Sequence, residues 1–390
     1  MPTNKANRTD KKIFISTGEL SGETHALHLV EALRLTGSYQ ISAMGSDKLA
    51  SAGSRIICDY KEISVTGLSE VASRILHIKK AINTVKQHLS SEVPDLVILV
   101  DFPGFNMRIA RFARSLRIPV VYFIPPQVWA WHSSRMKKIR EYVDMVVCIL
   151  PFERDLYASA GIEAVYVGHP FAETVKPTLG RGEFLRAAGV PDDRPILTIM
   201  PGSRENEIRR HMPVMVKAAD IMRRHIPGLA ILLPLADNIG EDMVRPLICD
   251  VEFITLLKGG SHNALAHCDA AIVASGSATL EAALLKAPTV IIYRISRFSY
   301  AIARIVVRID HIGLPNIIAG KEVFPEFIQH LEPEIIAKEA LSMIHKGRQG
   351  IAGELEPVID KLMQHGSYNL AAAAINNFLG KEHGPVPETY

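Results

Sequence analysis

The chain has 390 residues, of which 48% are hydrophobic and 22% are charged, and this ordinary globular composition excludes a disordered or fibrous protein. Its length exceeds the size at which a single hydrophobic core usually stops growing, so two domains are expected. The formal net charge of +3 is too small for the dense basic face of a nucleic-acid-binding protein, so no nucleic acid partner is expected.

Short apolar runs rich in β-branched residues alternate with amphipathic helical stretches in the first half of the chain. This alternation predicts a parallel sheet covered by helices, because parallel strands are buried on both faces and are joined by long crossovers. In chain order, the first series of strands is expected at Ile13–Thr17, Leu96–Val100, Val120–Phe123, Met145–Ile149 and Ala164–Val167.

The second half repeats this pattern after a break. Residues 170–195 carry four prolines, three glycines and many charges, which is typical of a domain linker with one short helix. The tail has helical patterns and no further strand. The expected strands are Ile196–Met200, Ala230–Leu233, Ala270–Ala274 and Thr289–Tyr293, and the expected tail helices are Pro333–His345 and Tyr368–Leu379.

The two series predict an α/β fold with two doubly wound, parallel-sheet domains. Ligands of such sheets bind beyond the carboxyl ends of the strands, so site residues are expected directly after the runs. We predict a polar tail at 1–12, an N-terminal domain at 13–170, a C-terminal domain at 171–345, and helices at 346–390 that pack on an N-terminal domain.

A small-residue turn, Pro201-Gly202-Ser203-Arg204, follows one predicted strand and leads into a helical stretch. Such a turn offers unpaired backbone N–H groups and the positive end of a helix dipole to an anion. Arg204 adds a charged fork that suits phosphate oxygens. The alternative is an ordinary strand-to-helix turn with a surface arginine. We name this segment the 201–204 turn and predict that it binds phosphate.

A second turn of this kind, the 275–277 turn, follows the predicted strand at Ala270–Ala274. It consists of Ser275, Gly276 and Ser277, and Ser277 is expected to be the N-cap of the next helix. Two such turns in one domain can hold both phosphates of a nucleotide diphosphate. Glu281, one turn inside the helix, either accepts hydrogen bonds from ribose hydroxyls or stabilises the helix dipole.

The first predicted strand is also followed by a turn and a helix start, in the segment Gly18-Glu-Leu-Ser-Gly-Glu23. The segment lacks the G-x-G-x-x-G spacing, and the chain has no P-loop motif, so neither Rossmann dinucleotide binding nor P-loop chemistry is indicated. Glu19 and Ser21, with the adjacent Gly22, are expected to line a cleft between the domains, or else to cap the helix.

The fully apolar run Leu96–Val100 ends in Asp101, and a Pro-Gly turn follows. A carboxylate at the carboxyl end of a strand, partly desolvated by Phe102 and Phe105, suits a general base. The alternative is that Asp101 caps a helix that starts near Asn106.

Both tryptophans, Trp129 and Trp131, lie just past a predicted strand and are followed by four basic residues between positions 135 and 140. They form either a buried aromatic loop or an apolar platform for an amphiphile with an anionic headgroup. Aromatic and basic residues are combined again in a predicted helix at residues 294–308. Half of this helix is expected to pack in the core with its arginines in solvent, and the rest is a candidate membrane-facing patch. No H-E-x-x-H, Asp-x-Asp or His/Cys cluster is present, so neither a metal nor a cofactor is expected.

The compartment is indicated by the cysteines and the apolar runs. The four cysteines are far apart and form no C-x-x-C pair, which favours reduced thiols in a cytosolic protein. Residues 1–12 precede no apolar h-region, and no stretch reaches the ~20 uncharged apolar residues of a membrane span. The sequence predicts a cytoplasmic protein that is soluble or lies on a membrane surface.

Read in order, seven segments resemble the lipid-A-disaccharide synthase family. They span residues from about 13 to 330, and their order and spacing make the resemblance specific. The segments are Gly18-Glu-Leu-Ser-Gly22, Val100-Asp-Phe-Pro-Gly-Phe-Asn106, Pro126-Gln-Val-Trp-Ala-Trp131, Val167-Gly-His-Pro170, Pro201-Gly-Ser-Arg204, Ala274-Ser-Gly-Ser-Ala-Thr-Leu-Glu281 and Gly313-Leu-Pro-Asn316.

The resemblance implies a GT-B fold, with an acceptor-binding N-terminal domain and a UDP-sugar-binding C-terminal domain that face each other across a cleft. It also implies the reaction: UDP-2,3-diacylglucosamine and 2,3-diacylglucosamine 1-phosphate (lipid X) give a β-1,6-linked lipid A disaccharide 1-phosphate and UDP. The family inverts the anomeric centre without a metal or cofactor, in lipopolysaccharide biosynthesis of Gram-negative bacteria. The chain is then expected on the anionic surface of the inner membrane, and a homodimer is left open.

The same resemblance assigns roles to individual residues. Asp101 matches the family's essential aspartate, the implied general base, and Arg204 matches its phosphate-binding arginine. Glu281 and Asn316 match an acidic residue and an asparagine near the nucleotide. On the first domain, the acceptor and the cleft are assigned to Glu19, Ser21, Gly22, Trp129 and Trp131, and on the second domain the donor is assigned to Gly202, Ser203, Arg204, Ser275, Gly276, Ser277, Glu281 and Asn316.

Three positions depart from the family pattern. The usual Gly-Glu-Ala-Ser-Gly-Asp has Leu20 and Glu23 here, and His132 replaces the arginine that commonly follows Trp-Ala-Trp. These changes predict altered acceptor contacts but the same reaction class. Two alternative functions remain at this point: a UDP-sugar epimerase on the same fold, and a non-catalytic protein that binds a nucleotide-linked lipid.

Overall fold

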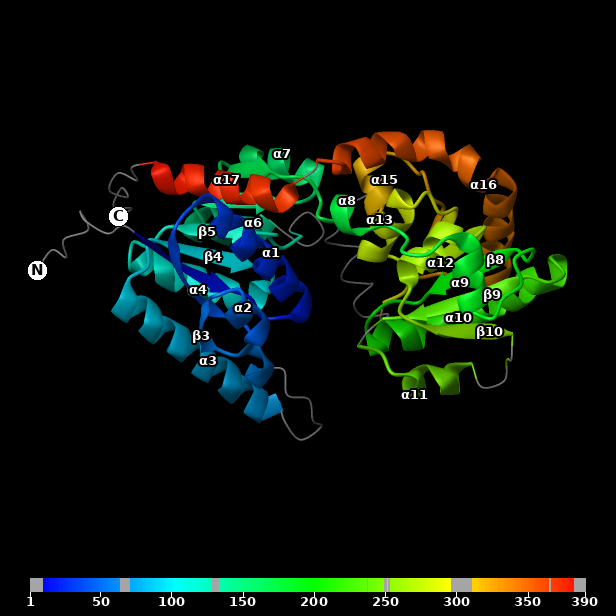
Figure 1. Ribbon diagram of the computed structural model, residues 1–390, viewed down its shortest axis with the longest axis horizontal. Helices are drawn as coiled ribbons and strands as arrows, with labels where there is room; N and C mark the ends of the chain where they lie inside the picture. Colours follow the sequence, from blue (N-terminus) through cyan, green and yellow to red (C-terminus); the bar gives the residue numbers. More distant parts are fainter. Residues whose placement is uncertain are drawn as a thin grey trace, which may run out of the picture. The chain divides into compact units, whose positions relative to one another are not determined.

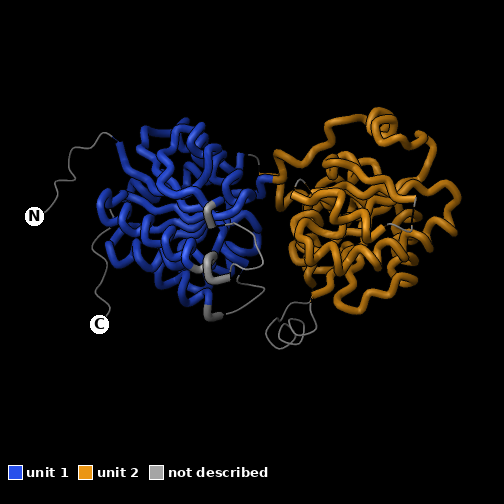
Figure 2. Tube along the Cα trace, turned by 90° about the horizontal axis from the view of Figure 1, so that it is seen from below, with its two compact units in different colours: residues 1–170, 366–390 blue, residues 171–365 orange. Residues whose placement is uncertain are grey.

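The computed structural model describes residues 10–63, 71–127, 133–236, 238–248, 251, 253–295, 311–364 and 366–381. The chain forms two compact units, which Figure 2 colours separately. The first unit comprises residues 1–170 and 366–390, and the second comprises residues 171–365. Each unit has its own parallel sheet and its own hydrophobic core.

The first unit is built on a seven-stranded parallel sheet with the strand order β3-β2-β1-β4-β5-β6-β7. Its order changes direction between β1 and β4, so the carboxyl ends of these two strands form the switch point at which ligands of such sheets bind. The strands are β1 Lys11–Ser16, β2 Tyr39–Met44, β3 Arg55–Cys58, β4 Leu96–Val100, β5 Val120–Phe123, β6 Met145–Cys148 and β7 Glu163–Tyr166.

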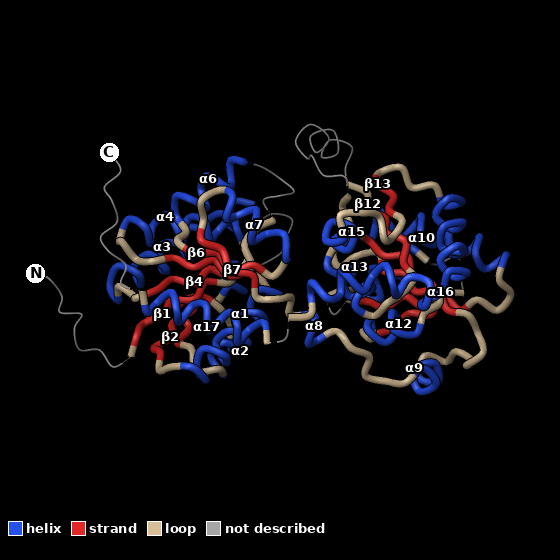
Figure 3. The backbone as a smooth tube through the Cα atoms, turned by 90° about the horizontal axis from the view of Figure 1, so that it is seen from above, coloured by secondary structure: helices blue, strands red, loops and turns tan. Residues whose placement is uncertain are grey.

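Helices cover both faces of this sheet (Figures 1 and 3) because alternate strand residues enter opposite cores. The helices are α1 Leu20–Thr36, α2 Asp47–Ser51, the 3-10 turn η1 Tyr60–Ile63, α3 Val71–Glu92, α4 Pro103–Ser115, α6 Ser133–Tyr142, α7 Pro151–Ser159 and α17 Ser367–Gly380. Phe14 of β1 packs with α3, α4 and α6, whereas Ile13 and Ile15 pack with α1 and α17.

The second unit has a six-stranded parallel sheet with the strand order β10-β9-β8-β11-β12-β13. The strands are β8 Ile196–Met200, β9 Ala230–Leu235, β10 Ile254–Lys258, β11 Ala270–Ala274, β12 Thr289–Tyr293 and β13 Glu326–Ile328. The helices are α8 Phe171–Thr174, α9 Arg181–Ala187, α10 Glu205–His225, α11 Glu241–Val244, the 3-10 turn η2 Arg245–Leu247, α12 Ser261–His267, α13 Ser277–Leu284, α15 Leu314–Ala319 and α16 Pro333–Leu362.

All nine predicted strands are present, and the prediction of two parallel sheets with helices is confirmed. Four further strands, β2, β3, β10 and β13, were not predicted. Three of them are edge strands and the fourth, β2, lies beside an edge. Most of their residues are at least partly exposed, so these strands mix polar with apolar side chains and lack a long continuous apolar run.

The predicted linker is more ordered than the sequence indicated. One short helix was expected between residues 170 and 195, whereas the structure has two, α8 and α9. Phe184 and Leu185 of α9 are buried in the core that covers one face of the second sheet. Two apolar residues among prolines, glycines and charges give too weak a periodicity for sequence analysis to detect a packed helix.

The two C-terminal helices pack on different sheets. Helix α16, kinked at Gly347, packs on α10 in the second unit. Its Arg348 donates to the carbonyls of Leu285 and Cys268 over 2.7 and 2.8 Å, which satisfies free C-terminal carbonyls of α13 and α12. Helix α17 packs on α1 in the first unit, where Tyr368 Oη lies 2.9 Å from His25 Nδ1. Within the described part of the chain, no helix is long and apolar enough to cross a membrane.

Candidate functional site

The carboxyl end of β4 has an unusual backbone. Asp101 and Phe102 both have positive φ angles, 47° and 48°, in a region that non-glycine residues rarely occupy. Phe102 is the N-cap residue of α4, and the helix begins at Pro103. Two consecutive left-handed residues persist only when their surroundings hold them.

Asn106 and Tyr122 hold this backbone in place. Asn106 is fully buried, and its Nδ2 donates to the carbonyls of Asp101 and Val100 over 2.7 and 3.1 Å. The hydroxyl of Tyr122 donates to the Asp101 carbonyl over 2.8 Å. Burial raises the pKa of Tyr122 well above its ordinary value, and the nearby Asp101 charge raises it further. Tyr122 therefore remains a hydrogen-bond donor throughout the neutral range.

The turn after β1 packs against Asp101 and Phe102. A side chain at Gly18 would clash with Phe102, because its Cβ would lie 2.1 Å from the ring carbon Cδ1. A Cβ at Gly22 would lie 3.6 Å from that of Asp101. Ser16, the last residue of β1, is joined to α4, since its hydroxyl donates to Asn106 Oδ1 over 2.7 Å. The structure thus brings the predicted Gly18–Gly22 segment and Asp101 together.

Three consecutive residues of that turn face outward. Glu19, Leu20 and Ser21 are exposed, and Glu19 occupies the N-cap position of α1 without a side-chain capping hydrogen bond. Glu23, which departs from the family pattern, points inward instead. Its carboxylate is fully buried and accepts hydrogen bonds from Ser46 Oγ at 2.8 Å and from Tyr60 Oη at 3.0 Å.

In the second unit, the two predicted phosphate turns leave neighbouring strands. Met200 at the end of β8 pairs with Val273 of β11, so both turns begin at the carboxyl ends of two adjacent parallel strands. Gly202 has a φ of 121°, and a Cβ there would lie 2.5 Å from Glu207 Oε2. Arg204 is the N-cap residue of α10, and its side chain is 78% exposed, with Nη1 3.2 Å from Glu207 Oε1.

The 275–277 turn differs in one detail from the prediction. Gly276, with a φ of 155°, is the N-cap residue of α13, so the expectation that Ser277 is the N-cap was wrong. Glycine adopts this backbone without strain, which lets the helix begin one residue earlier. Ser275 Oγ donates to the Ile312 carbonyl over 3.0 Å. Glu281 is 16% exposed, and its Oε2 lies 3.5 Å from His262 Nε2 of α12.

Asn316 is fully buried, and its amide group is hydrogen-bonded to the chain beside it. Oδ1 accepts from the backbone N–H groups of Val323 and Phe324 at 2.9 and 3.0 Å, and Nδ2 donates to the Phe324 carbonyl over 2.8 Å. Its immediate role is to fix this loop.

Sequence analysis did not assign a role to three residues whose buried side chains hold the turns. Asn106 holds Asp101, as described above. Glu326 on the short strand β13 accepts hydrogen bonds from the backbone N–H of Gly313 at 2.8 Å and from His311 Nδ1 at 2.9 Å. His211 on α10 contacts the carbonyl of Pro201. The only signal in the sequence was a polar residue at a position expected to be buried. Its role can be recognised only when the fold shows its hydrogen-bond partners.

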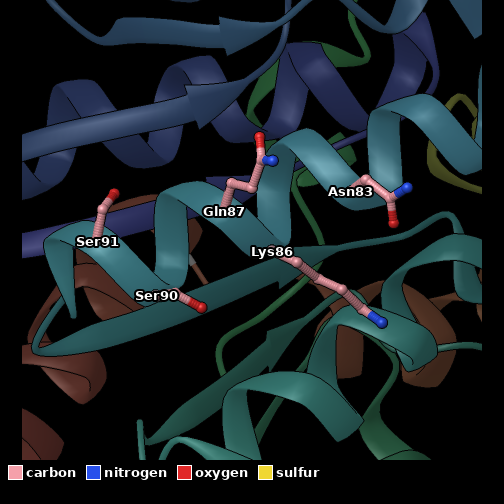
Figure 4. Close-up of a pocket in the computed structure, with 5 residues that line it drawn as sticks. All are labelled: Asn83, Lys86, Gln87, Ser90 and Ser91. Carbon is pink, nitrogen blue, oxygen red and sulfur yellow. The ribbon is translucent and has the colours of Figure 1, made fainter.

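Several predicted residues lie outside the described residues, and these include Trp129, Trp131 and His132. Among the described residues, no three His, Cys, Asp or Glu side chains are grouped so that they can hold a metal ion. A surface hollow of about 510 Å³ lies along α3 (Figure 4) and contains none of the predicted site residues. Its lining comes from one helix: Asn83, Lys86, Gln87, Ser90 and Ser91.

A model of the family described as lipid-A-disaccharide synthetase matches residues 13–378. The lipid-A-disaccharide synthase of Syntrophus aciditrophicus is 41% identical over 368 residues, which cover 93% of this chain and 96% of that protein. The enzyme of the same name from Geobacter sulfurreducens is 37% identical and covers 96% of this chain and 99% of that protein. The chain belongs to the lipid-A-disaccharide synthase family. It is therefore a member of a glycosyltransferase family, as the sequence predicted.

Solved structures agree in fold. A Staphylococcus aureus MnaA–UDP co-structure superposes with a TM-score of 0.66 at 15% identity and covers 95% of this chain and 97% of that one. The calicheamicin glycosyltransferase CalG4 gives 0.59 at 15% identity and covers 97% of this chain and all of that one. At such identities the likeness concerns the fold alone, and the predicted GT-B fold class is confirmed.

Proposed function

We propose that the protein transfers the sugar of UDP-2,3-diacylglucosamine to 2,3-diacylglucosamine 1-phosphate, giving the β-1,6-linked disaccharide 1-phosphate of lipid A and UDP. The observation that carries this proposal is the family match, which extends over both sheets and includes the turns after β1, β4, β8 and β11. The relatives' common name supports the same reaction.

In the proposed reaction, Asp101 is the general base. Its carboxylate removes the proton of the acceptor 6-hydroxyl while that oxygen attacks the anomeric carbon of the donor sugar from the face opposite UDP. The bond between the anomeric carbon and the UDP oxygen breaks, and the electron pair leaves with UDP, which inverts the anomeric centre. The left-handed backbone at residues 101 and 102, held by Asn106 and Tyr122, supports this role because it fixes the direction of the carboxylate.

The donor is proposed to bind at the carboxyl edge of the second sheet. Backbone N–H groups of Gly202 and Ser203, with the exposed guanidinium of Arg204, stabilise the charge that develops on UDP without a metal. The 275–277 turn takes the second phosphate, and Glu281 accepts from ribose hydroxyls. Asn316 acts through the 323–324 loop that it holds.

The acceptor is proposed to bind on the first unit, near Asp101. The exposed residues Glu19 and Ser21, with Gly22, form its surroundings. The family resemblance adds Trp129 and Trp131, which lie outside the described residues. Peripheral binding to an anionic inner membrane is supported by α6, which exposes four basic side chains within six residues, and exposed Lys and Arg each add roughly 1 kcal/mol near such a surface. The four are Arg135, Lys137, Lys138 and Arg140.

UDP release tests this function directly. The protein is incubated with the acylated donor alone, the acylated acceptor alone, and both together. The proposal expects UDP and the disaccharide only with both substrates. Conversion of a lone UDP-sugar identifies an epimerase, and binding of the donor without UDP release identifies a non-catalytic carrier.

Asp101→Asn tests the base. This change keeps the shape of the side chain and removes its basicity, so turnover is lost while UDP affinity, measured by calorimetry, stays near that of the wild type. Asp155→Asn, at a 75% exposed position of α7, is the matched control and retains turnover. Normal turnover by Asp101→Asn removes this residue from the base role.

A further inference from the structure

His211 is a fully buried histidine in the second turn of α10, and each of its ring nitrogens contacts a different loop. Nδ1 lies 2.8 Å from the carbonyl oxygen of Pro201, the first residue of the 201–204 turn. Nε2 accepts a hydrogen bond of 2.9 Å from the backbone N–H of Arg294, which directly follows β12. The ring therefore joins the turn after β8 to the segment after β12.

These two contacts define the protonation of the ring. A carbonyl oxygen can only accept, so Nδ1 carries the proton, and a backbone N–H can only donate, so Nε2 is unprotonated. The neutral ring makes both hydrogen bonds, whereas a protonated ring loses the bond to Arg294. Burial lowers the pKa of His211, which favours the neutral form.

The charged groups around the ring act in opposite directions, and burial outweighs them. Glu207, on the same helix, favours the protonated ring, and Arg294, after β12, opposes it. The ring of Tyr293, the last residue of β12, packs at a centroid distance of 5.9 Å. The side chain thus makes specific contacts on two sides.

We propose that His211 is a positioning residue for the nucleotide diphosphate, because it holds the 201–204 turn at a fixed place relative to the end of β12. This inference rests on the proposed donor site and deepens it. A ligand phosphate must meet the backbone N–H groups of Gly202 and Ser203 together with Arg204, and their common anchor is the preceding carbonyl of Pro201. When that anchor is lost, the turn can shift and the donors no longer converge on one phosphate.

Three substitutions separate the two contacts. His211→Asn can place an amide N–H near the position of Nδ1 and keep the bond to Pro201. His211→Gln can place an amide oxygen near the position of Nε2 and keep the bond to Arg294. His211→Leu keeps apolar volume and loses both. All four proteins are titrated with UDP by calorimetry at pH 7.5, and their unfolding is measured in urea.

The expected UDP affinity is highest for the wild type, then Asn, then Gln, and lowest for Leu, with a loss of about ten- to a hundredfold for Leu. The proposed Asp101 base lies in the other unit, so KM for the donor should rise more than kcat falls. Met222→Ala, a buried position three turns further along α10, is the control for loss of stability alone. It lowers the free energy of unfolding and leaves the UDP affinity unchanged.

Two different failures are distinguishable in this experiment. If the wild type does not bind UDP, the proposed donor site itself is wrong. If the wild type binds UDP and His211→Leu binds it equally well, or if Met222→Ala weakens binding as much as His211→Leu does, the positioning role is overturned while the donor site stands.

Discussion

Asn106 donates a hydrogen bond of 2.7 Å to the main-chain carbonyl of Asp101, and it does so from a fully buried position on α4. The residue it holds has a φ of 47°, so a contact between helix and strand end maintains a backbone that would otherwise relax. The backbone strain at Asp101 can therefore be measured through protein stability, separately from the catalytic role of its carboxylate.

The strain predicts that Asp101→Gly is more stable than Asp101→Ala. Both changes remove the carboxylate, but alanine keeps the Cβ that disfavours the left-handed region, so glycine gains about 1 kcal/mol in the free energy of unfolding. Urea unfolding measures the difference, and neither variant should turn over substrate. At Asp155, inside α7, the order reverses because alanine is the better helix former by about 1 kcal/mol. The same order at both positions contradicts the strain.

We predict that one added methyl group in the 201–204 turn lowers both the free energy of unfolding and the affinity for UDP. In Gly202→Ala, the new Cβ would lie 2.9 Å from the Cβ of Glu207, which the helix holds, and 2.5 Å from its Oε2, on a backbone with a φ of 121°. The turn must move, so the free energy of unfolding falls by about 1–3 kcal/mol and UDP binds more weakly. Gly353→Ala, on the exposed side of α16 with no atom within 4 Å of the new Cβ, is the control and gains up to about 1 kcal/mol. Wild-type UDP affinity in Gly202→Ala rules out a tight fit at this turn.

Glu23 predicts a loss of stability on an isosteric change. Its carboxylate accepts hydrogen bonds from three donors, the backbone N–H and hydroxyl of Ser46 and the hydroxyl of Tyr60. Glu23→Gln turns an amide N–H₂ toward at least one of these donors, which costs about 2–3 kcal/mol in a buried site. Chemical denaturation measures this loss. Tyr60→Phe, which removes one donor only, should cost about 1 kcal/mol. If Glu23→Gln is as stable as the wild type, the carboxylate is not needed at this position.

The main features of the fold were predictable from the sequence, because central strands are buried on both faces and therefore form continuous apolar runs. The run Leu96–Val100 is fully buried, and it coincides with β4. Strand β13 has only three partly exposed residues, and its pairing with β12 depends on contacts distant in sequence. No local pattern reveals such a strand.

The site residues divide in a similar way. Gly202 and Asp101 stand in recognisable turns after strands, so the sequence indicated them directly. Asn106 and His211 act through hydrogen bonds to backbone atoms that are 5 and 10 residues away in the chain, and His211 also bonds the segment that follows β12. A polar residue on the buried face of a helix looks like a packing defect until its partners are known.

Two histidines of the first unit predict that acid weakens its folding. Burial, with a smaller effect from His28, lowers the pKa of His25 to about 4, and burial and the nearby His25 lower that of His169 to about 3. In an unfolded chain both have pKa values of about 6.5. Between these limits the unfolded state binds more protons, so the free energy of unfolding falls as the pH drops from about 6.5 toward 4.

Calorimetric melting across this range should show a decreasing Tm for the first unit. In His25→Asn, whose amide can still bond Tyr368, the decrease in Tm should be shallower. Above about pH 8 both histidines are neutral in the folded and the unfolded state, so the Tm values of the two proteins should change with pH in parallel. Equal slopes below pH 6.5 would show that the buried His25 does not contribute.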